Sequence, residues 1–185
     1  MQNKPQIKNK KEVCRSKIFK IEELSINFKN GEQRTYERIC ANNNNIGSVL
    51  IVAKTNDDNI VLVKEYSAGI EDYKLGFPAG GIERNETVFG AADRELQEEA
   101  GFSAKQYTLI KRIFVSPNYM KSNSTSIVLG ENLTCKKLDG DEPEHLEVIK
   151  WPIKNIDLLL NSNEFIDSKS ITALLLVWKQ WIHKK

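Results

Sequence analysis

The spacing of apolar residues predicts which parts of the chain form strands and which form helices. A continuous apolar run predicts a buried strand at residues 47–53, and further strands are predicted at 60–66, 107–115 and 124–129. The stretch 87–100 is rich in helix formers and stops at Gly101, so we expect a helix that ends in a glycine C-terminal cap. Apolar positions at helical spacing predict a short helix at 156–160 and a longer closing helix at 170–183.

The first 41 residues follow a different pattern. Residues 1–15 are polar and rich in lysine, and we expect them to form a disordered, solvated basic tail. Partly alternating apolar positions on either side of Asn30-Gly31, a strong turn signal, predict a β-hairpin over residues 16–41. A run of asparagines then separates this hairpin module from a main domain over residues 46–185.

Composition and charge narrow the classes of function. The net charge of +2 over 185 residues gives no electrostatic case for nucleic acid as a partner. No apolar run approaches the roughly 18 residues that a membrane-spanning helix requires, and no apolar signal segment follows the basic start. Cys14, Cys40 and Cys135 are scattered and odd in number, which favours free thiols in a reducing compartment. We therefore expect a cytoplasmic protein that binds neither nucleic acid nor membrane.

The most distinctive chemistry lies in residues 80–102. On a helix, Glu95, Glu98 and Glu99 occupy positions i, i+3 and i+4 and share one face. Like charges at this spacing destabilise an isolated helix by about 0.2–0.5 kcal/mol per pair. A hard divalent cation such as Mg²⁺ or Mn²⁺ prefers carboxylate oxygens and offsets that repulsion. Most charge runs are solvated helix faces, but the glycine-rich loop before the helix and Arg94 within it favour a metal site.

These residues resemble the signature of the Nudix hydrolase family, G-x5-E-x7-R-E-U-x-E-E-x-G-U, in which U is a bulky apolar residue. Every fixed position is matched, by Gly80, Glu86, Arg94, Glu95, Leu96, Glu98, Glu99, Gly101 and Phe102. The resemblance implies an α/β (α+β) fold, an α/β/α sandwich on a mixed sheet, which here follows the N-terminal β-hairpin. It also implies a metal-dependent hydrolase that cleaves a nucleoside diphosphate linked to another group.

The resemblance further implies roles for individual residues. Glu95 and Glu99 are implied as ligands of Mg²⁺ or Mn²⁺. Glu98 is implied as an auxiliary ligand with a catalytic role, and the backbone carbonyl of Ala79 as another ligand. Structural roles in the signature are implied for Gly80, Glu86, Arg94 and Gly101.

An acidic loop at residues 139–144 lies outside the signature. Relatives that hydrolyse ADP-ribose place a general base and a further metal ligand on a loop in this position. By that resemblance Glu142 is implied as the general base and Glu144 as a metal ligand. A solubilising acidic turn is the alternative for both, and we expect the neighbouring His145 to be structural.

Within the Nudix family, further stretches resemble the bacterial ADP compounds hydrolases of the NudE type. These stretches are residues 15–19, 28–31, 36–38, 64–69, 140–144 and 151–152. That branch hydrolyses ADP-ribose, diadenosine polyphosphates and NADH, and releases AMP. Dedicated ADP-ribose pyrophosphatases carry an arginine where Ser67 stands, which favours the broader branch. The loop at residues 77–80 reads as in ADP-ribose hydrolases, so a dedicated ADP-ribose pyrophosphatase remains an alternative.

The resemblance also implies a homodimer in which the N-terminal hairpin reaches over the partner subunit. Contacts to adenine or phosphate are then expected from Phe28, Arg34, Glu37 and Arg38. Ordinary cross-strand or core positions are the alternative for each of these residues. A second class of function is a Nudix-fold sensor that binds ADP-ribose or NAD without cleaving it. A third reading is a hydrolase of RNA 5′ ends, which predicts a basic groove that the balanced charge does not suggest.

Overall fold

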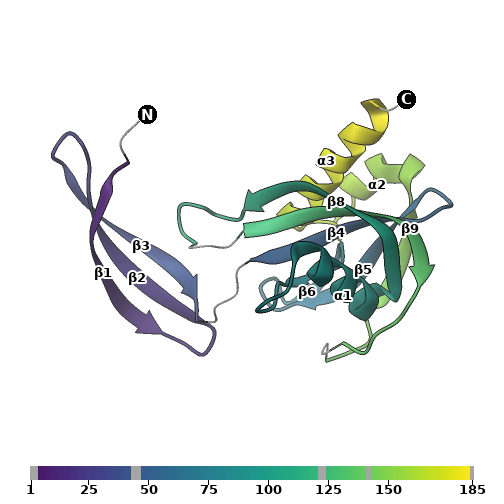
Figure 1. Cartoon of the computed structure of the whole chain (residues 1–185), viewed down its shortest axis with the longest axis horizontal. Coiled ribbons are helices and arrows are strands. Elements are labelled where there is room, and N and C mark those ends of the chain that lie inside the picture. The colour runs from purple at the N-terminus through teal and green to yellow at the C-terminus, as the bar shows by residue number, and fades with distance from the viewer. Residues whose placement is uncertain (1–3, 43–46, 121–123, 141–142, 184–185) are drawn as a thin grey trace.

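The structure is a computed structural model that describes residues 4–42, 47–120, 124–140 and 143–183. A three-stranded antiparallel sheet comes first in the chain and stands beside a larger α/β domain (Figure 1). Among the described residues, no helix has both the length and the apolar character needed to cross a membrane.

The N-terminal sheet consists of β1 (Gln6–Arg15), β2 (Phe19–Asn27) and β3 (Gln33–Ala41), in the order β1-β2-β3. The expectation of a disordered tail is therefore wrong for residues 6–15, and the expected hairpin is part of a three-stranded sheet. All ten residues of β1 are exposed. Backbone hydrogen bonds to β2 hold this strand in place, and its side chains do not contribute to a core. The strand therefore has no apolar pattern from which it could have been predicted.

The main domain is built on a mixed sheet in the order β10-β5-β4-β9-β8. Its strands are β4 (Ser48–Lys54), β5 (Asn59–Ser67), β6 (Asp72–Gly76), β7 (Ala79–Gly81), β8 (Phe102–Phe114), β9 (Ser124–Cys135) and β10 (Glu147–Pro152). Strand β4 runs parallel to β9, whereas β6 and β7 pair antiparallel with β5 and β4. The helices are α1 (Val88–Ala100), the single 3₁₀ turn η1 (Ile153–Asn155), α2 (Ile156–Leu160) and α3 (Ser168–His183).

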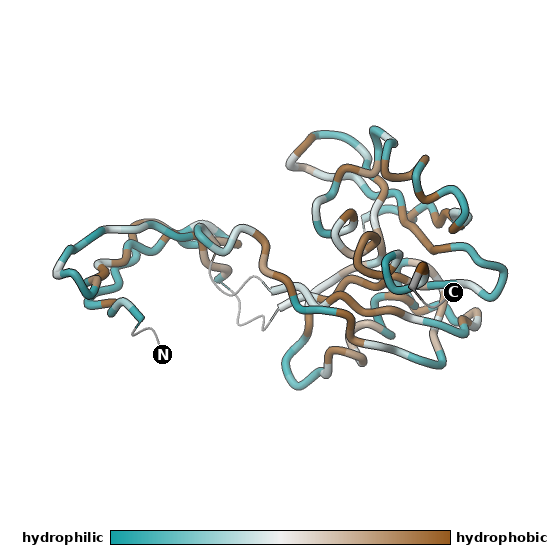
Figure 2. Tube along the Cα trace, turned by 90° about the horizontal axis from the view of Figure 1, so that it is seen from above, coloured by the Kyte–Doolittle hydropathy of each residue, from teal (hydrophilic) through white to brown (hydrophobic). Residues whose placement is uncertain are grey.

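Alternate residues of β4 face two hydrophobic layers on opposite sides of the sheet. Val49 and Ile51 pack in the layer that contains Leu96 of α1. Leu50 packs in the other layer with Leu174 of α3. Hydrophobic positions concentrate along these central strands (Figure 2). Helices thus cover both faces of a mixed sheet, which confirms the expected α/β/α sandwich of the Nudix fold.

The two sheets meet at the turn between β8 and β9. The backbone N–H of Ile39 in β3 donates to the carbonyl oxygen of Tyr119 at 2.7 Å. Ile39 also forms an isolated parallel bridge with Met120. Tyr119 and Met120 therefore pair with the edge of the N-terminal sheet and, among the described residues, join it to the main domain.

Candidate active site

Helix α1 begins and ends at defined caps. The Thr87 Oγ1 atom accepts a hydrogen bond from the backbone N–H of Gly90 at 3.0 Å, which satisfies a donor of the first turn. Gly101 adopts a left-handed conformation with φ 73°, and its N–H donates to the Gln97 carbonyl at 3.2 Å. The caps fix the helix between them, so Glu95, Glu98 and Glu99 project from it at set positions.

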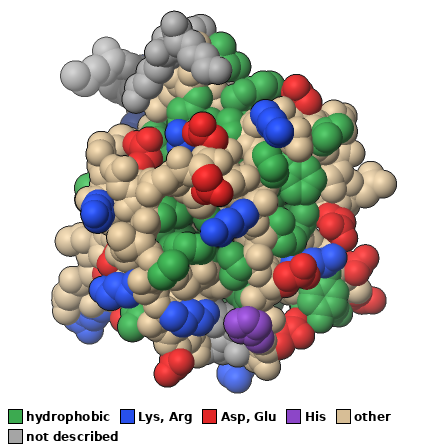
Figure 3. All heavy atoms as spheres, turned by 90° about the vertical axis from the view of Figure 1, so that its right-hand side faces the viewer, with side chains coloured by type: hydrophobic (Ala, Val, Ile, Leu, Met, Phe, Trp, Pro, Cys, Tyr) green, Lys and Arg blue, Asp and Glu red, His purple; other side chains and the backbone are tan. Residues whose placement is uncertain are grey.

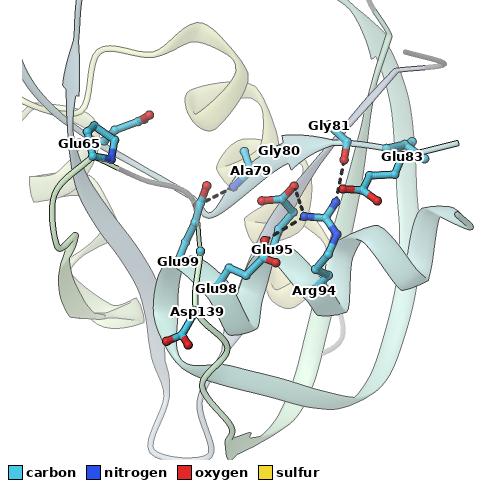
Figure 4. A pocket seen from close by; sticks show the side chains of 13 residues that line it. Glu65, Ala79, Gly80, Gly81, Glu83, Arg94, Glu95, Glu98, Glu99 and Asp139 are labelled. Carbon is cyan, nitrogen blue, oxygen red and sulfur yellow. Dashed lines mark hydrogen bonds and ion pairs between the residues drawn. The ribbon is translucent and has the colours of Figure 1, made fainter. Parts of the chain in front are cut away.

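Strand β7 brings the glycine-rich loop against this acidic face. The backbone N–H of Ala79 donates to Glu99 Oε2 at 3.0 Å (Figure 4). The buried Glu95 carboxylate lies so close to Gly80 that a Cβ atom on Gly80 would stand 2.0 Å from Glu95 Oε1. The missing side chain of Gly80 therefore provides the space that the Glu95 carboxylate occupies.

Arg94 joins the loop and the helix through all of its donors. Its Nε and Nη2 atoms donate to the two oxygens of Glu86, both at 3.1 Å, and Nη2 also donates to the Gly81 carbonyl at 2.9 Å. Its Nη1 atom donates to Glu95 Oε1 at 2.8 Å and to Glu98 Oε2 at 2.9 Å. The hydrogen bond with Glu86 raises the pKa of Arg94. Burial opposes ionisation of Glu86, but the bond from Arg94 leaves the pKa of Glu86 below its ordinary value.

Carboxylates surround a cavity of about 730 Å³ above this network. The acidic residues on its wall are Glu65, Glu83, Glu95, Glu98, Glu99 and Asp139. An adjoining hollow of about 310 Å³ shares Glu98, Glu99 and Asp139 with the cavity. Lys137, Glu144 and His145 line this smaller hollow. Below, the larger space is called the acidic cavity and the smaller one the side hollow.

The donor atoms around the acidic cavity fit a hard divalent cation. Carboxylate and carbonyl oxygens are the ligands that Mg²⁺ and Mn²⁺ prefer. In the described parts of the chain, however, no group of three or more His, Cys, Asp or Glu side chains is arranged to hold a metal ion. Arg94 engages the carboxylates of Glu95 and Glu98, so a cation would have to share them with the guanidinium.

The acidic loop reaches the same region. Asp139 and Gly140 line both spaces, and Glu144 lines the side hollow. Glu144 is exposed, and its Oε2 atom accepts a hydrogen bond from the Tyr73 hydroxyl at 3.1 Å, which raises the pKa of Tyr73. Glu142, the implied general base, lies outside the described residues.

The implied substrate contacts of the N-terminal sheet lie elsewhere in the chain. The linings of the acidic cavity and the side hollow include none of Phe28, Arg34, Glu37 and Arg38. Glu37 and Arg38 line a separate hollow of about 790 Å³ between the N-terminal sheet and the β8–β9 turn. Within one chain, these residues are therefore not brought to the acidic cavity.

Arg38 is engaged in an ion pair on the N-terminal sheet. Its Nη2 atom lies 2.8 Å from Glu22 Oε2, and the Lys20 ammonium lies 2.8 Å from Glu22 Oε1. The Lys20 ammonium and then the Arg38 guanidinium hold the pKa of the buried Glu22 at about 2, below its ordinary value of 4.5. The Nε and Nη2 atoms of Arg38 thus take part in a structural contact within the sheet.

This depressed pKa predicts an acid-sensitive contribution to stability. Because ionised Glu22 is favoured in the folded state, its contribution is complete above the ordinary pKa of 4.5 and is lost as the pH falls toward about 2. We expect Glu22→Gln to lower the melting temperature at neutral pH, and the difference from wild type to shrink on acidification. Glu23→Gln, next to it in β2, is the matched control and should show no such convergence. A constant difference at every pH would contradict the assignment.

A second polar network holds α1 on β8 and was not found from the sequence. Asp93 accepts hydrogen bonds from the Tyr107 hydroxyl at 2.7 Å, from Ser103 Oγ at 2.6 Å and from Gln97 Nε2 at 2.8 Å. Burial and then the bond to Asp93 raise the pKa of Tyr107. Sequence reasoning also missed Glu65, whose carboxylate lies 3.0 Å from the Lys74 ammonium at the cavity wall. Apart from Gln97, which lies one turn from Asp93 on α1, these partners lie on other elements, so helical spacing does not indicate them.

Two family models cover most of the chain. The model of the NudE-type Nudix hydrolase N-terminal domain matches residues 5–38. The model of the NUDIX domain matches residues 45–172.

Curated relatives and a solved structure match over nearly the full length. The ADP compounds hydrolase NudE of Escherichia coli (strain K12) is 39% identical over 179 residues, which is 97% of this chain and 94% of that relative. The ADP-ribose pyrophosphatase of Bacillus subtilis (strain 168) is 28% identical over 167 residues, which is 89% of this chain and 88% of that relative. A crystal structure of an ADP compounds hydrolase aligns with a TM-score of 0.89 at 38% identity, covering 98% of this chain and 96% of that chain.

Proposed function

Because the chain belongs to the Nudix hydrolase family, we propose that it hydrolyses the diphosphate bond of ADP-containing compounds and releases AMP. The proposed substrates are ADP-ribose, diadenosine polyphosphates and NADH. The observation that carries the proposal is the acidic face of α1 against the glycine-rich loop, where Ala79 and Gly80 contact Glu99 and Glu95. The names of the full-length relatives, an ADP compounds hydrolase and an ADP-ribose pyrophosphatase, support the substrate class.

Nudix hydrolases use divalent metals, and we assign the metal-binding residues of this chain as follows. Glu95 and Glu99 hold Mg²⁺ or Mn²⁺, and Glu98 is an auxiliary ligand. Glu144 and the carbonyl of Ala79 complete the proposed set. When bound, the cation neutralises the diphosphate and lowers the pKa of the attacking water. The chain's own part is to fix these oxygens, which the caps of α1 and the bonds of Arg94 support.

The proton of the attacking water needs a carboxylate base. We propose Glu142 for this role because its chain neighbours Gly140 and Pro143 line the acidic cavity. Glu98 is the second candidate, since its carboxylate lies on the wall of both spaces.

The experiment that tests the function is a substrate panel with product identification. Purified protein is incubated with ADP-ribose, diadenosine tetraphosphate or NADH, with Mg²⁺, Mn²⁺ or a chelator, and products are separated by chromatography. Release of AMP that depends on the cation is the expected result. Turnover of ADP-ribose alone would identify a dedicated ADP-ribose pyrophosphatase. Saturable binding of ADP-ribose without turnover of any compound would identify a sensor instead.

Two observations weigh against the alternative functions. A sensor has no need of the signature glutamates, and this chain retains all of them. A hydrolase of RNA ends needs a basic groove to bind the RNA backbone. Among the described residues that line the acidic cavity, Arg94 carries a positive charge, whereas six residues are acidic. On the face of the main domain drawn in Figure 3, lysines and arginines are interspersed with acidic and apolar side chains, without a continuous basic patch. We place the enzyme in the cytoplasm, which suits three cysteines that form no disulfide with one another.

We further propose that the enzyme works as a homodimer in which the N-terminal sheet lies against the partner. The hollow beside this sheet exposes large hydrophobic side chains, with Tyr36 45%, Phe114 57% and Tyr119 68% exposed. In the dimer, Phe28, Arg34, Glu37 and Arg38 would approach the partner's substrate.

Deleting residues 1–41 is therefore expected to give a monomer with reduced selectivity for adenine compounds. The mass of the particle is measured by light scattering, and AMP release is compared across purine and pyrimidine substrates. The point variant Tyr119→Asp, which leaves the sheet in place, should weaken the dimer in the same assay. A truncated monomer with full activity and selectivity would rule out the contribution across subunits.

A further inference from the structure

The acidic cavity poses an electrostatic problem for a substrate that carries several phosphates. Carboxylates dominate its wall, so positively charged side chains with unused donors are needed where phosphates lie beyond the metal site. In the described part of the chain, the arginine and lysine residues that line the acidic cavity and the side hollow are Arg94 and Lys137.

Arg94 has no donor left for a phosphate. A guanidinium carries five N–H groups. In this structure they serve Glu86, Gly81, Glu95 and Glu98 through five hydrogen bonds. Arg94 therefore organises the carboxylates and leaves phosphate binding to another residue.

Lys137 is held at the C-terminal end of α1 by its surroundings. The backbone N–H of Lys136 donates to the Gly101 carbonyl at 2.9 Å, and that of Leu138 donates to the Gln97 carbonyl at 3.3 Å. The Lys137 stem lies beside Gly101, and its ammonium donates to the Glu98 carbonyl. An ammonium has three donors, and within the described part of the chain Lys137 uses one of them, which leaves two that can serve a ligand.

Lys137 is placed to contact a phosphate that lies away from Glu95 and not one that lies beside it. Lys137 lines the side hollow and not the acidic cavity, whereas Glu95 lines the acidic cavity and not the side hollow. Glu98 and Glu99, together with Asp139, Gly140 and Pro143, form the wall that the two spaces share. A ligand that reaches Lys137 must therefore extend past the Glu98–Glu99 wall, away from Glu95.

Building on the proposed function, we propose that Lys137 binds a phosphate beyond the cleaved bond and thereby favours diadenosine polyphosphates over the shorter ADP-ribose. The two N–H groups of Lys137 that no described residue accepts donate to the oxygens of that phosphate. ADP-ribose has two phosphates and gains less from this contact than a substrate with four. Lys137 is thus a specificity-determining residue of the side hollow.

The test compares Lys137→Met with wild type on diadenosine tetraphosphate and ADP-ribose. Methionine keeps an unbranched apolar stem and removes the charge. A hydrogen bond to a charged group contributes about 1.5–3 kcal/mol, so KM for the tetraphosphate should rise at least about tenfold with little change in kcat. The loss on ADP-ribose should be several times smaller, and Lys137→Arg should recover most of the loss. Lys136→Met, an exposed neighbour that lines neither space, is the matched control.

Equal losses on both substrates, or a fall in kcat with a lower melting temperature, would mean that Lys137 only caps α1, and would overturn the proposal. Titration with inorganic tripolyphosphate gives a readout that needs no turnover. We expect Lys137→Met to bind tripolyphosphate about tenfold more weakly than wild type. If wild type cleaves neither compound, the proposed function is wrong. If Lys137→Met binds tripolyphosphate as tightly as wild type, the proposed role of Lys137 is wrong.

Discussion

Replacing Glu99 by glutamine is expected to lower the rate of AMP release from ADP-ribose by more than about a hundredfold. The loss of a partner in the outer shell of a metal site typically costs about 10- to 100-fold, and Glu99 is proposed as a direct ligand. The fold should change little, because the amide oxygen of glutamine can still accept the hydrogen bond from the Ala79 N–H. The measurements are kcat over a range of Mg²⁺ concentrations, Mg²⁺ affinity by calorimetry, and the melting temperature.

The matched control for Glu99→Gln is Glu83→Gln. Glu83 is exposed and lines the same acidic cavity, but it stands in the loop before α1 and has no proposed ligand role. Both variants remove one negative charge from the cavity wall. A similar loss in both would point to a general effect of cavity charge, and unchanged turnover in Glu99→Gln would rule out its assignment as a ligand.

The parts of the fold that follow from local patterns could be predicted from the sequence. Helix α1 was expected over 87–100 with Gly101 as its cap, and it spans Val88–Ala100 with Gly101 in the left-handed conformation. Helix propensity and a glycine stop are local signals, so no tertiary information was needed. Strand β4 was predicted for a similar reason, since its five central residues are buried and apolar.

The elements that depend on pairing alone could not be predicted in this way. Strand β1 exposes all ten of its residues, so neither period nor burial marks it. Strand β10 was also missed, because all six of its residues are exposed or half-buried and it is defined by its pairing with β5. Both strands lie at the edge of a sheet, where backbone hydrogen bonds rather than apolar contacts fix the register.

The same distinction applies to the candidate site. The shared face of Glu95, Glu98 and Glu99 follows from helical spacing within one element. The bonds of Arg94 to Glu86 and Gly81, the contact between Lys137 and the Glu98 carbonyl, and the pairing of Arg38 with Glu22 join different segments, which helical spacing does not indicate. The residue type of Arg38 suggested a phosphate contact, but type alone does not reveal that its Nε and Nη2 atoms donate to Glu22.

Replacing Gly80 by alanine is expected to reduce both stability and activity, because the new methyl group would occupy the space of a carboxylate. A Cβ atom at this position would lie 2.0 Å from Oε1 and 2.1 Å from Cδ of Glu95. Glu95 is buried and hydrogen-bonded to Arg94. Removing the overlap between the new methyl group and Glu95 therefore requires either a rotation of the Glu95 side chain or a shift of β7 away from α1. Overpacking of this kind costs about 1–3 kcal/mol, and about 2–4 °C in melting temperature per kcal/mol for a chain of this size.

The matched control is Gly69→Ala, since a Cβ atom on Gly69 meets nothing within 4 Å. Both substitutions make the same change in unfolded-chain entropy, so the difference between them isolates the collision with Glu95. We expect Gly69→Ala to keep the wild-type melting temperature and turnover, and Gly80→Ala to lose turnover as well as Mg²⁺ affinity because its Glu95 is displaced. If Gly80→Ala bound Mg²⁺ and released AMP as well as Gly69→Ala, the position of the Glu95 carboxylate against Gly80 would have no part in the metal site, and the proposed ligand set would need another member in its place.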